Sequence, residues 1–276
     1  MKRWNTSKIR AAKGDHKIAC LTAYDYALAK LADNAGIHLI LVGDSLGMTT
    51  LGYPTTLPVT MTDMLHHTAA VVRGTTEALV VADMPFLSYQ ISIEEAIRNA
   101  GRFLQEAGAD AVKIEGGAIR KECVRALTSN GIPVLGHIGL LPQSINNIGG
   151  FKVQGKTREA VELLLEDARQ LTEAGVFGIV LECVPPDVAA LVTASVPVPV
   201  IGIGSGSACD GQILVMNDLL GLSHNPPAKF VKQYASLAPR IEDAFCAYIK
   251  DVEIGDYPAP EHFYASTQLK SSSELN

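Results

Sequence analysis

The stretch LQEAGADAVKIEGG, residues 104–117, contains the elements of one βα repeat. It begins with the end of a helix-like segment, passes through an Ala-Gly pair, and continues into a short aliphatic run. Glycine just past a helix permits the left-handed conformation that ends it. Because side chains alternate along a strand, Lys113 and Glu115 share one face, and Val112 and Ile114 share the other. The segment therefore predicts a strand with two charged groups on one side.

The same plan recurs along the chain. LADNAGIHLILVGD (31–44) and LTEAGVFGIVLE (171–182) repeat the helix end, the Ala-Gly pair, the aliphatic strand and a final carboxylate. Five other segments keep the strand without the Ala-Gly pair, and some of them also end on a polar residue. The last of the five is also compatible with a helix. These segments are KIACLTAYD (17–25), ALVVAD (78–83), GIPVLGH (131–137), VPVIGIGSG (198–206) and QILVMND (212–218).

Near-continuous aliphatic strands separated by helical segments are typical of parallel βα units. About eight such units in 276 residues predict an α/β protein with a (β/α)₈ TIM barrel, for which ~250 residues is typical. The alternative is an open doubly wound sheet, but its nucleotide-binding forms carry G-x-G-x-x-G after the first strand, where this chain has TAYDYA. We expect one barrel domain over residues 1–265, with an N-terminal helical lid over a barrel end, and a disordered tail over 266–276.

Composition narrows the class of protein. A net charge of -6 argues against nucleic acid as a partner, because such proteins carry a basic surface. No apolar run approaches the roughly 18 residues of a membrane helix. The five cysteines are scattered without CxxC spacing, which favours a reduced, cytoplasmic protein. The basic, acid-free segment 1–14 is also compatible with a short transit peptide.

Polar residues follow the predicted strands at their carboxyl ends, the face where TIM barrels build active sites. Taken singly, each is equally explained as a helix cap or a rim salt bridge, but the series on successive strands favours one shared site. The residues are Asp44, Asp83, Glu115, His137 and Glu182.

Clustered carboxylates raise each other's pKa unless a cation lies between them, and carboxylate oxygens suit Mg²⁺. We expect Asp44 and Asp83 as metal ligands, with Glu115 as a third, directly or through water. Lys113 faces the same cavity, where it stabilises charge or, alternatively, forms a Schiff base. Glu182 is a candidate general base. Metal, lysine and base together fit enolate chemistry on a 2-oxo acid.

Several blocks of the chain, taken in order over residues 4–260, resemble the ketopantoate hydroxymethyltransferase family. The blocks are LVGDSLGM (41–48), TLPVTMTDMLHHTAAVVRG (56–74), ADMPF (82–86), VKIEGG (112–117), GHIGLLPQS (136–144), GGFKVQG (149–155), VLECVP (180–185) and IGIGSG with CDGQILV (201–215). Ser205 stands where the family commonly has alanine.

The resemblance implies a barrel of the phosphoenolpyruvate/pyruvate type, bound Mg²⁺, and a large homo-oligomer, typically a decamer. It implies transfer of a one-carbon unit from 5,10-methylenetetrahydrofolate to 3-methyl-2-oxobutanoate through a Mg-stabilised enolate, giving 2-dehydropantoate for pantothenate synthesis. The loop at residues 142–155 would border the folate site.

The resemblance also implies a role for each matching residue. Asp44, Asp83 and Glu115 would bind the metal; Ser45, Asp44, Asp83 and Lys113 would contact the substrate; His137 would line the pocket, and Glu182 would remove the C3 proton. Two other functions stay open: a lyase or mutase of the same barrel group, and a non-catalytic barrel that binds an oxo acid or a folate. We expect Cys183, next to Glu182, to face the helices.

Overall fold

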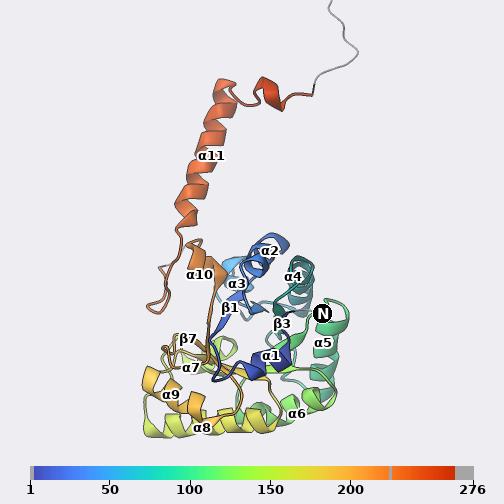
Figure 1. The fold of residues 1–276 in the computed structure, drawn as a ribbon, viewed down its shortest axis with the longest axis vertical. Coiled ribbons are helices and arrows are strands. Elements are labelled where there is room, and N and C mark those ends of the chain that lie inside the picture. Colours follow the sequence, from blue (N-terminus) through green and yellow to red (C-terminus); the bar gives the residue numbers. More distant parts are fainter. Residues whose placement is uncertain (1–2, 224–225, 265–276) are drawn as a thin grey trace, which may run out of the picture.

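The computed structural model describes residues 3–223 and 226–264. Eight parallel strands lie in sequence order and close into a barrel, because β8 pairs with β1 (Figure 1). The predicted (β/α)₈ barrel is confirmed, and the open-sheet alternative is excluded. The strands are β1 Ile18–Thr22, β2 Leu39–Val42, β3 Leu79–Asp83, β4 Ala111–Glu115, β5 Val134–Gly139, β6 Gly178–Glu182, β7 Val200–Ile203 and β8 Gly211–Leu214.

Helices lie between the strands and form the outer layer of the barrel (Figure 1). The segment QILVMND divides between β8 and the short helix α10, so both interpretations of it were partly correct. The α-helices are α1 Thr6–Ala11, α2 Tyr26–Asn34, α3 Leu46–Thr49, α4 Met61–Gly74, α5 Ile93–Gln105, α6 Lys121–Ser129, α7 Ile145–Ile148, α8 Arg158–Glu173, α9 Pro186–Ser195, α10 Met216–Leu220 and α11 Leu237–Ile254. Three short 3₁₀ helices are η1 Ala118–Arg120, η2 Pro142–Ser144 and η3 Pro260–His262.

Strand alternation divides the buried apolar residues into two clusters. On β4, Val112 and Ile114 belong to the cluster between the barrel and the helices, whereas Ala111 belongs to the cluster inside the barrel. Ile9 and Ala12, from and just after α1, join the inner cluster beside residues that begin the strands. The first helix therefore packs at the amino end of the barrel, and the carboxyl end stays available for polar groups.

None of the described helices has the length and apolar character that crossing a membrane requires. The predicted disordered tail, residues 266–276, lies outside the described residues.

Asp33 ties the end of α2 to the chain that enters β3. Its Oδ1 accepts backbone N–H bonds from Glu77 and Ala78, and its Oδ2 accepts from the N–H and hydroxyl of Thr76, all within 2.8–3.0 Å. Burial raises the pKa of Asp33, but these hydrogen bonds outweigh it and lower the pKa below the usual value of 3.8. The ionised carboxylate is therefore the form that the fold requires.

We predict that Asp33→Asn destabilises the protein by about 2 kcal/mol at pH 7, because an amide cannot accept all four hydrogen bonds. Since the folded pKa is lowered, the stabilisation is fully present above the unfolded pKa and is lost as pH falls through the folded pKa. Urea unfolding of both proteins between pH 7 and pH 3 should therefore show a difference that shrinks in acid.

The matched control is Asp187→Asn, at an exposed aspartate in the first turn of α9. It should leave the free energy of unfolding within about 0.5 kcal/mol of the unsubstituted protein. A difference between Asp33→Asn and the unsubstituted protein that did not change with pH would contradict the role of the Asp33 charge.

Candidate active site

One cavity of about 450 Å³ lies at the carboxyl ends of the strands and gathers every residue that the sequence singled out. Its lining also includes Thr22, Cys183, Phe151 and Asp218, which were not predicted as site residues. The predicted residues on its wall are Asp44, Ser45, Asp83, Lys113, Glu115, His137 and Glu182.

Strand register explains why distant residues meet. Asp83 on β3 pairs in register with Lys113 on β4, and Glu115 pairs in register with His137 on β5. Strands β3, β4 and β5 turn these residues toward the barrel interior, so their side chains lie at neighbouring heights on one wall. Asp44 is different, because β2 ends at Val42 and Asp44 lies in the loop two residues beyond it.

Lys113 is the centre of the charge network. Its side chain is 4% exposed, and its Nζ lies 2.9 Å from Asp83 Oδ1 and 3.7 Å from Glu115 Oε1. Burial alone lowers the pKa of Lys113, but the charges of Asp83, Glu115 and Asp44 outweigh it and raise the pKa. The two carboxylate contacts of Lys113 favour the ammonium form, which suits charge stabilisation better than a Schiff base, whose formation requires the unprotonated amine.

The three deep carboxylates respond differently to this ammonium. Burial, followed by repulsion from Asp83 and Glu115, raises the pKa of Asp44 well above its usual value. Burial also raises the pKa of Asp83, although Lys113 opposes it. Burial raises the pKa of Glu115 too, but Lys113 and His137 outweigh it and lower that pKa. Lys113 therefore does not offset burial and repulsion at all three carboxylates.

His137 connects the deep layer to Glu182. Its Nδ1 lies 3.1 Å from Lys113 Nζ and 3.6 Å from Glu115 Oε1, and its Nε2 lies 3.2 Å from Glu182 Oε2. Burial and Lys113 lower the pKa of His137, but contacts with Glu115 and Glu182 outweigh them and raise it to about 9. The Glu182 side chain is 15% exposed, compared with 2–4% for Asp83, Lys113 and Glu115.

A chain of hydrogen-bonded hydroxyl groups orients the Ser45 side chain. The Ser45 and Tyr24 hydroxyl oxygens lie 2.8 Å apart, and Thr22 donates to the Tyr24 oxygen at 2.8 Å. The N–H of Met216 in turn donates to Thr22 Oγ1. Sequence reasoning missed Thr22 and Tyr24, although the polar end of the first strand, TAYD, was a signal for them.

Gln143 and Tyr89 are two further polar groups that sequence reasoning missed. Gln143, in η2, contacts Asp44 and Glu115, and Tyr89 contacts Gln143 from the loop after β3. No strand periodicity extends to these positions, so only the block PQS that contains Gln143 drew attention to the loop.

The chain bends sharply where β6 ends, and this corrects the expectation for Cys183. Cys183 borders the cavity because its φ of +51° breaks the strand alternation that would turn it toward the helices. Ser205, fully buried, braces this bend: its hydroxyl donates to the Leu181 carbonyl at 2.8 Å and accepts from the Val184 N–H at 3.3 Å. Glu182 is held between these two anchored positions.

The glycines after Glu115 serve the backbone and its packing. Gly116 adopts a φ of +112°, which side chains rarely allow. A Cβ on Gly117 would lie 1.9 Å from Asp167 Cγ, so α8 packs directly on this residue, and Asp167 accepts the N–H of Ala118 at 2.7 Å. The pair lets α8 approach the end of β4.

The donor chemistry of the cavity fits a hard divalent cation. Glu115 Oε1 is buried without a hydrogen-bond partner, and burial together with repulsion from Asp83 and Glu115 raises the pKa of Asp44. Within residues 3–223 and 226–264, no three His, Cys, Asp or Glu side chains already form an ion-binding cage. Mg²⁺ commonly takes only one or two carboxylates and completes its shell with water and substrate, so the arrangement fits Mg²⁺ better than a metal that needs a closed protein shell.

A family model described as ketopantoate hydroxymethyltransferase matches residues 3–260. The chain belongs to the ketopantoate hydroxymethyltransferase family. It is 56% identical over 260 residues to the 3-methyl-2-oxobutanoate hydroxymethyltransferase of Syntrophus aciditrophicus (strain SB), covering 94% of this chain and 96% of that protein. The resemblance inferred from the motif blocks is thereby confirmed.

Solved structures of lower identity share the fold of this family member. A 2,3-dimethylmalate lyase of the PEP mutase/isocitrate lyase superfamily superposes with a TM-score of 0.59 at 18% identity, covering 94% of this chain and 91% of that one. A phosphonopyruvate hydrolase in complex with oxalate and Mg²⁺ gives 0.58 at 16% identity, covering 100% and 94%. At such identities the likeness establishes the barrel type alone.

We predict that Ser205→Ala destabilises this family member by about 1 to 2 kcal/mol, because it leaves the buried Val184 N–H without its partner. Urea unfolding measures the difference. The control is Ser207→Ala in the same loop, at an exposed serine. Equal stability of the two variants would show that the Ser205 hydroxyl does not brace the end of β6.

Proposed function

We propose that this protein transfers a hydroxymethyl group from 5,10-methylenetetrahydrofolate to 3-methyl-2-oxobutanoate, giving 2-dehydropantoate. In the balanced reaction, C3 of the oxo acid loses a proton and bonds to the one-carbon unit, water supplies the hydroxyl, and tetrahydrofolate leaves. The observation that carries the proposal is the cavity that joins Lys113 and His137 with Asp44, Asp83, Glu115 and Glu182 in a chain of this family.

Asp44, Asp83 and Glu115 are the proposed Mg²⁺ ligands, some of them through water. Their buried, mutually repelling charges support this role, and so does the Mg²⁺ in the phosphonopyruvate hydrolase of similar fold. When bound, Mg²⁺ supplies Lewis-acid stabilisation of the negative charge that develops on the oxo acid.

The substrate contacts follow from the groups that remain. The Ser45 hydroxyl, oriented by Tyr24, donates to the substrate carboxylate, and the Lys113 ammonium compensates the same negative charge. Asp44, in the loop after β2, and Asp83, at the end of β3, border this position. We propose that the substrate binds together with the metal, because the substrate carboxylate alone would add negative charge to a cluster that is already anionic.

Glu182 is the proposed base for the C3 proton. Its ion contact is with His137 and not with Lys113, unlike those of Asp83 and Glu115. Its partial exposure lets it face a bound substrate, and His137 holds its Oε2 in place. Phe151, in the loop over residues 142–155, borders the cavity mouth, which supports this loop as a boundary of the folate site.

We predict that Glu182→Gln loses exchange of the C3 proton of 3-methyl-2-oxobutanoate by at least about 100-fold, because the amide cannot accept the proton. NMR in ²H₂O with Mg²⁺ follows exchange without folate, and a second assay follows product formation when methylenetetrahydrofolate is added. The unsubstituted protein should perform both reactions.

The control, Glu162→Gln on the exposed face of α8, should leave both rates unchanged. Unaltered exchange in Glu182→Gln would remove Glu182 as the base. A folded, Mg²⁺-supplied protein that exchanges the proton but forms no product would indicate a lyase or mutase, and one that binds the oxo acid without exchange would indicate a non-catalytic barrel.

We propose a cytoplasmic location. The five cysteines are free, including Cys20, Cys123 and Cys209 in the buried interior, which suits a reducing compartment.

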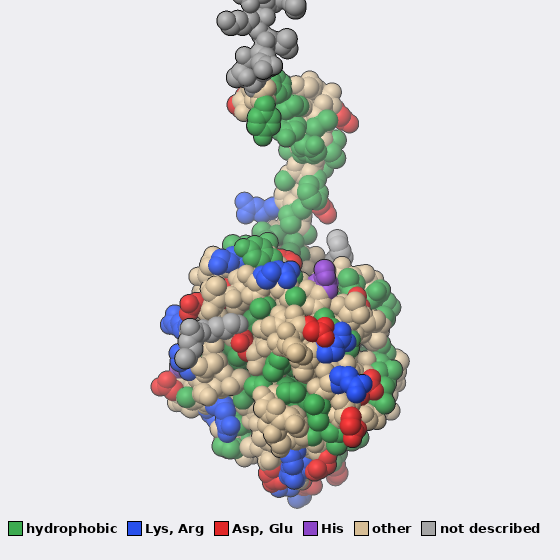
Figure 2. All heavy atoms as spheres, turned by 90° about the vertical axis from the view of Figure 1, so that its right-hand side faces the viewer, with side chains coloured by type: hydrophobic (Ala, Val, Ile, Leu, Met, Phe, Trp, Pro, Cys, Tyr) green, Lys and Arg blue, Asp and Glu red, His purple; other side chains and the backbone are tan. Residues whose placement is uncertain are grey.

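We also propose that the protein assembles with copies of itself. The family resemblance implies a homo-oligomer that is typically a decamer. Helix α11 extends away from the barrel and has no buried residue (Figures 1 and 2). Ile241, Phe245, Tyr248 and Val252 follow one another at spacings of four, three and four, so they share one face, and Phe245 is 62% exposed. An apolar helix face of this kind marks an interaction surface.

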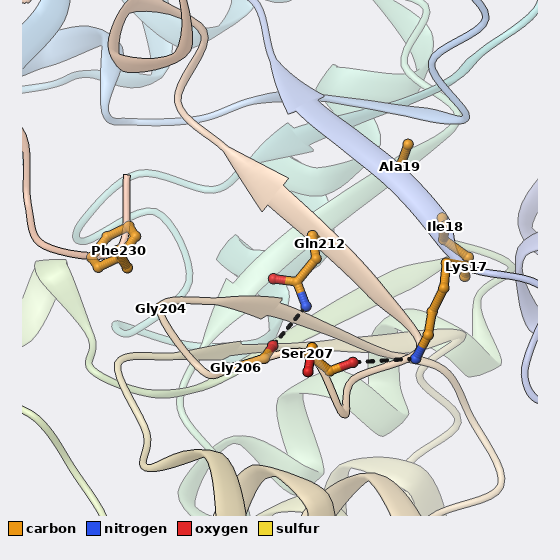
Figure 3. Close-up of a pocket in the computed structure, with 8 residues that line it drawn as sticks. All are labelled: Lys17, Ile18, Ala19, Gly204, Gly206, Ser207, Gln212 and Phe230. Carbon is orange, nitrogen blue, oxygen red and sulfur yellow. Dashed lines mark hydrogen bonds between the residues drawn. The ribbon is translucent and has the colours of Figure 1, made fainter. Parts of the chain in front are cut away.

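The barrel offers a complementary groove. Between β1, β8 and the loop after β7 lies a hollow of about 620 Å³, shown in Figure 3. Ala19 on β1 and Gln212 on β8 point outward into this hollow and are exposed. Within residues 211–223, the only helix after β8 is the short α10, which leaves this side of the two strands uncovered. Phe230 adds an apolar wall. The fit of α11 from a second copy into this groove would cover both surfaces.

We predict that Phe245→Glu and Ala19→Arg each reduce the mass of the assembly, because each places a charge in the same apolar contact. Size-exclusion chromatography with light scattering measures the mass. Leu163→Glu, at an exposed leucine on α8, is the control and should not change it. Unchanged mass in Phe245→Glu would contradict assembly through α11, and unchanged mass in Ala19→Arg alone would move the contact away from the groove.

A further inference from the structure

Gln143 lies between two of the proposed metal ligands and is 5% exposed. Its backbone N–H donates to Glu115 Oε2 at 3.1 Å, and its side-chain Nε2 donates to Asp44 Oδ2 at 3.0 Å. The same Nε2 donates to the Met84 carbonyl at 2.9 Å. One residue from η2 thus contacts carboxylates that come from the ends of β2 and β4.

The orientation of the Gln143 amide is determined by its neighbours. Its Oε1 accepts from the Tyr89 hydroxyl at 2.7 Å and from Gln90 Nε2 at 3.3 Å. A reversed amide would bring its oxygen against the Asp44 carboxylate and the Met84 carbonyl, which are both acceptors, and its NH₂ against Gln90 Nε2, which is a donor. Only the observed orientation satisfies both ends of the amide.

The network uses one oxygen of each carboxylate. Glu115 Oε2 is occupied by the Gln143 N–H, whereas Oε1 is buried without a hydrogen-bond partner. Asp44 Oδ2 is likewise held by the Gln143 amide. A carboxylate that is anchored through one oxygen presents the other in a fixed direction, which is how outer-sphere groups orient metal ligands.

We infer that Gln143 is a positioning residue that orients Asp44 and Glu115 for a divalent cation. Tyr89 fixes the Gln143 amide, and its hydroxyl also accepts the backbone N–H of Glu115 at 3.3 Å. This inference rests on the proposed metal site. It adds that cation affinity depends on a side chain in the loop after β5, which is not itself a ligand in this arrangement.

Mn²⁺ binding to the full chain, measured by electron paramagnetic resonance without substrate, tests the inference. Gln143→Met keeps the length of the side chain and the backbone N–H but removes the amide donors. We expect it to weaken Mn²⁺ binding by about 10- to 100-fold. Tyr89→Phe keeps the ring and should give a smaller loss, because the amide remains but is less fixed.

A second readout separates positioning from general damage. For Gln143→Met, the Mg²⁺ concentration that gives half-maximal proton exchange should rise, while the exchange rate at saturating Mg²⁺ recovers toward that of the unsubstituted protein. Gln170→Met on α8, whose amide donates to Glu166, is the matched control and should bind Mn²⁺ normally. If Gln143→Met does not fold, Gln143→Leu, which also removes the amide donors, replaces it in the Mn²⁺ measurement.

The outcomes distinguish this inference from the proposed function. Equal Mn²⁺ affinity in the unsubstituted protein and both network variants overturns the role of Gln143 and leaves the metal site in place. Failure of the unsubstituted protein to bind Mn²⁺, or unchanged binding in Asp83→Asn, overturns the metal site itself and with it the inference.

Discussion

The site depends on one buried ion cluster, in which the Lys113 ammonium lies among Asp83, Glu115 and Asp44. A buried ammonium without anions is strongly unfavourable, and so are carboxylates that face only each other. The buried ammonium and the buried carboxylates therefore stabilise each other. The contact of 2.9 Å between Lys113 and Asp83 is the shortest between them. The barrel makes this possible because its closed parallel register holds Asp83 opposite Lys113 on adjacent strands. The remaining negative charge of the cluster is the feature on which the proposed cation site rests.

Around this cluster, neutral groups orient the site side chains without adding charge. The hydroxyls of Thr22 and Tyr24 reach Ser45 from one side, and the amide of Gln143 reaches Asp44 from the other. A neutral hydrogen-bond donor can hold a carboxylate oxygen without competing for the place of a metal ion, as a second lysine would. The strands thus provide most of the charged groups, and the segments that follow the strands provide most of the groups that orient them.

The parts of the site that periodicity governs were predictable, and those beyond it were not. Lys113 and Glu115 could be assigned to one wall because β4 is regular and buried on both faces, and the repeat of strand and carboxylate identified the barrel. Cys183 was assigned to the wrong side because the positive φ at that residue ends the alternation one residue after Glu182. Gln143 lies beyond Gly139, whose φ of +91° turns the chain out of β5, so no pattern of spacing could place its amide against Asp44.

The exposure of the acids divides the cavity into two layers. Asp83 and Glu115 are almost fully enclosed and share Lys113, so their protonation is coupled to a fixed charge. Glu182 lies above them, is partly open to the cavity, and contacts the cluster only through His137. A base must gain and lose a proton in each cycle, and a carboxylate outside the ammonium network can do so without disrupting the ion cluster. The separation of Glu182 from Lys113 by an imidazole is thus a physical reason to assign proton transfer to Glu182 and charge stabilisation to the layer beneath it.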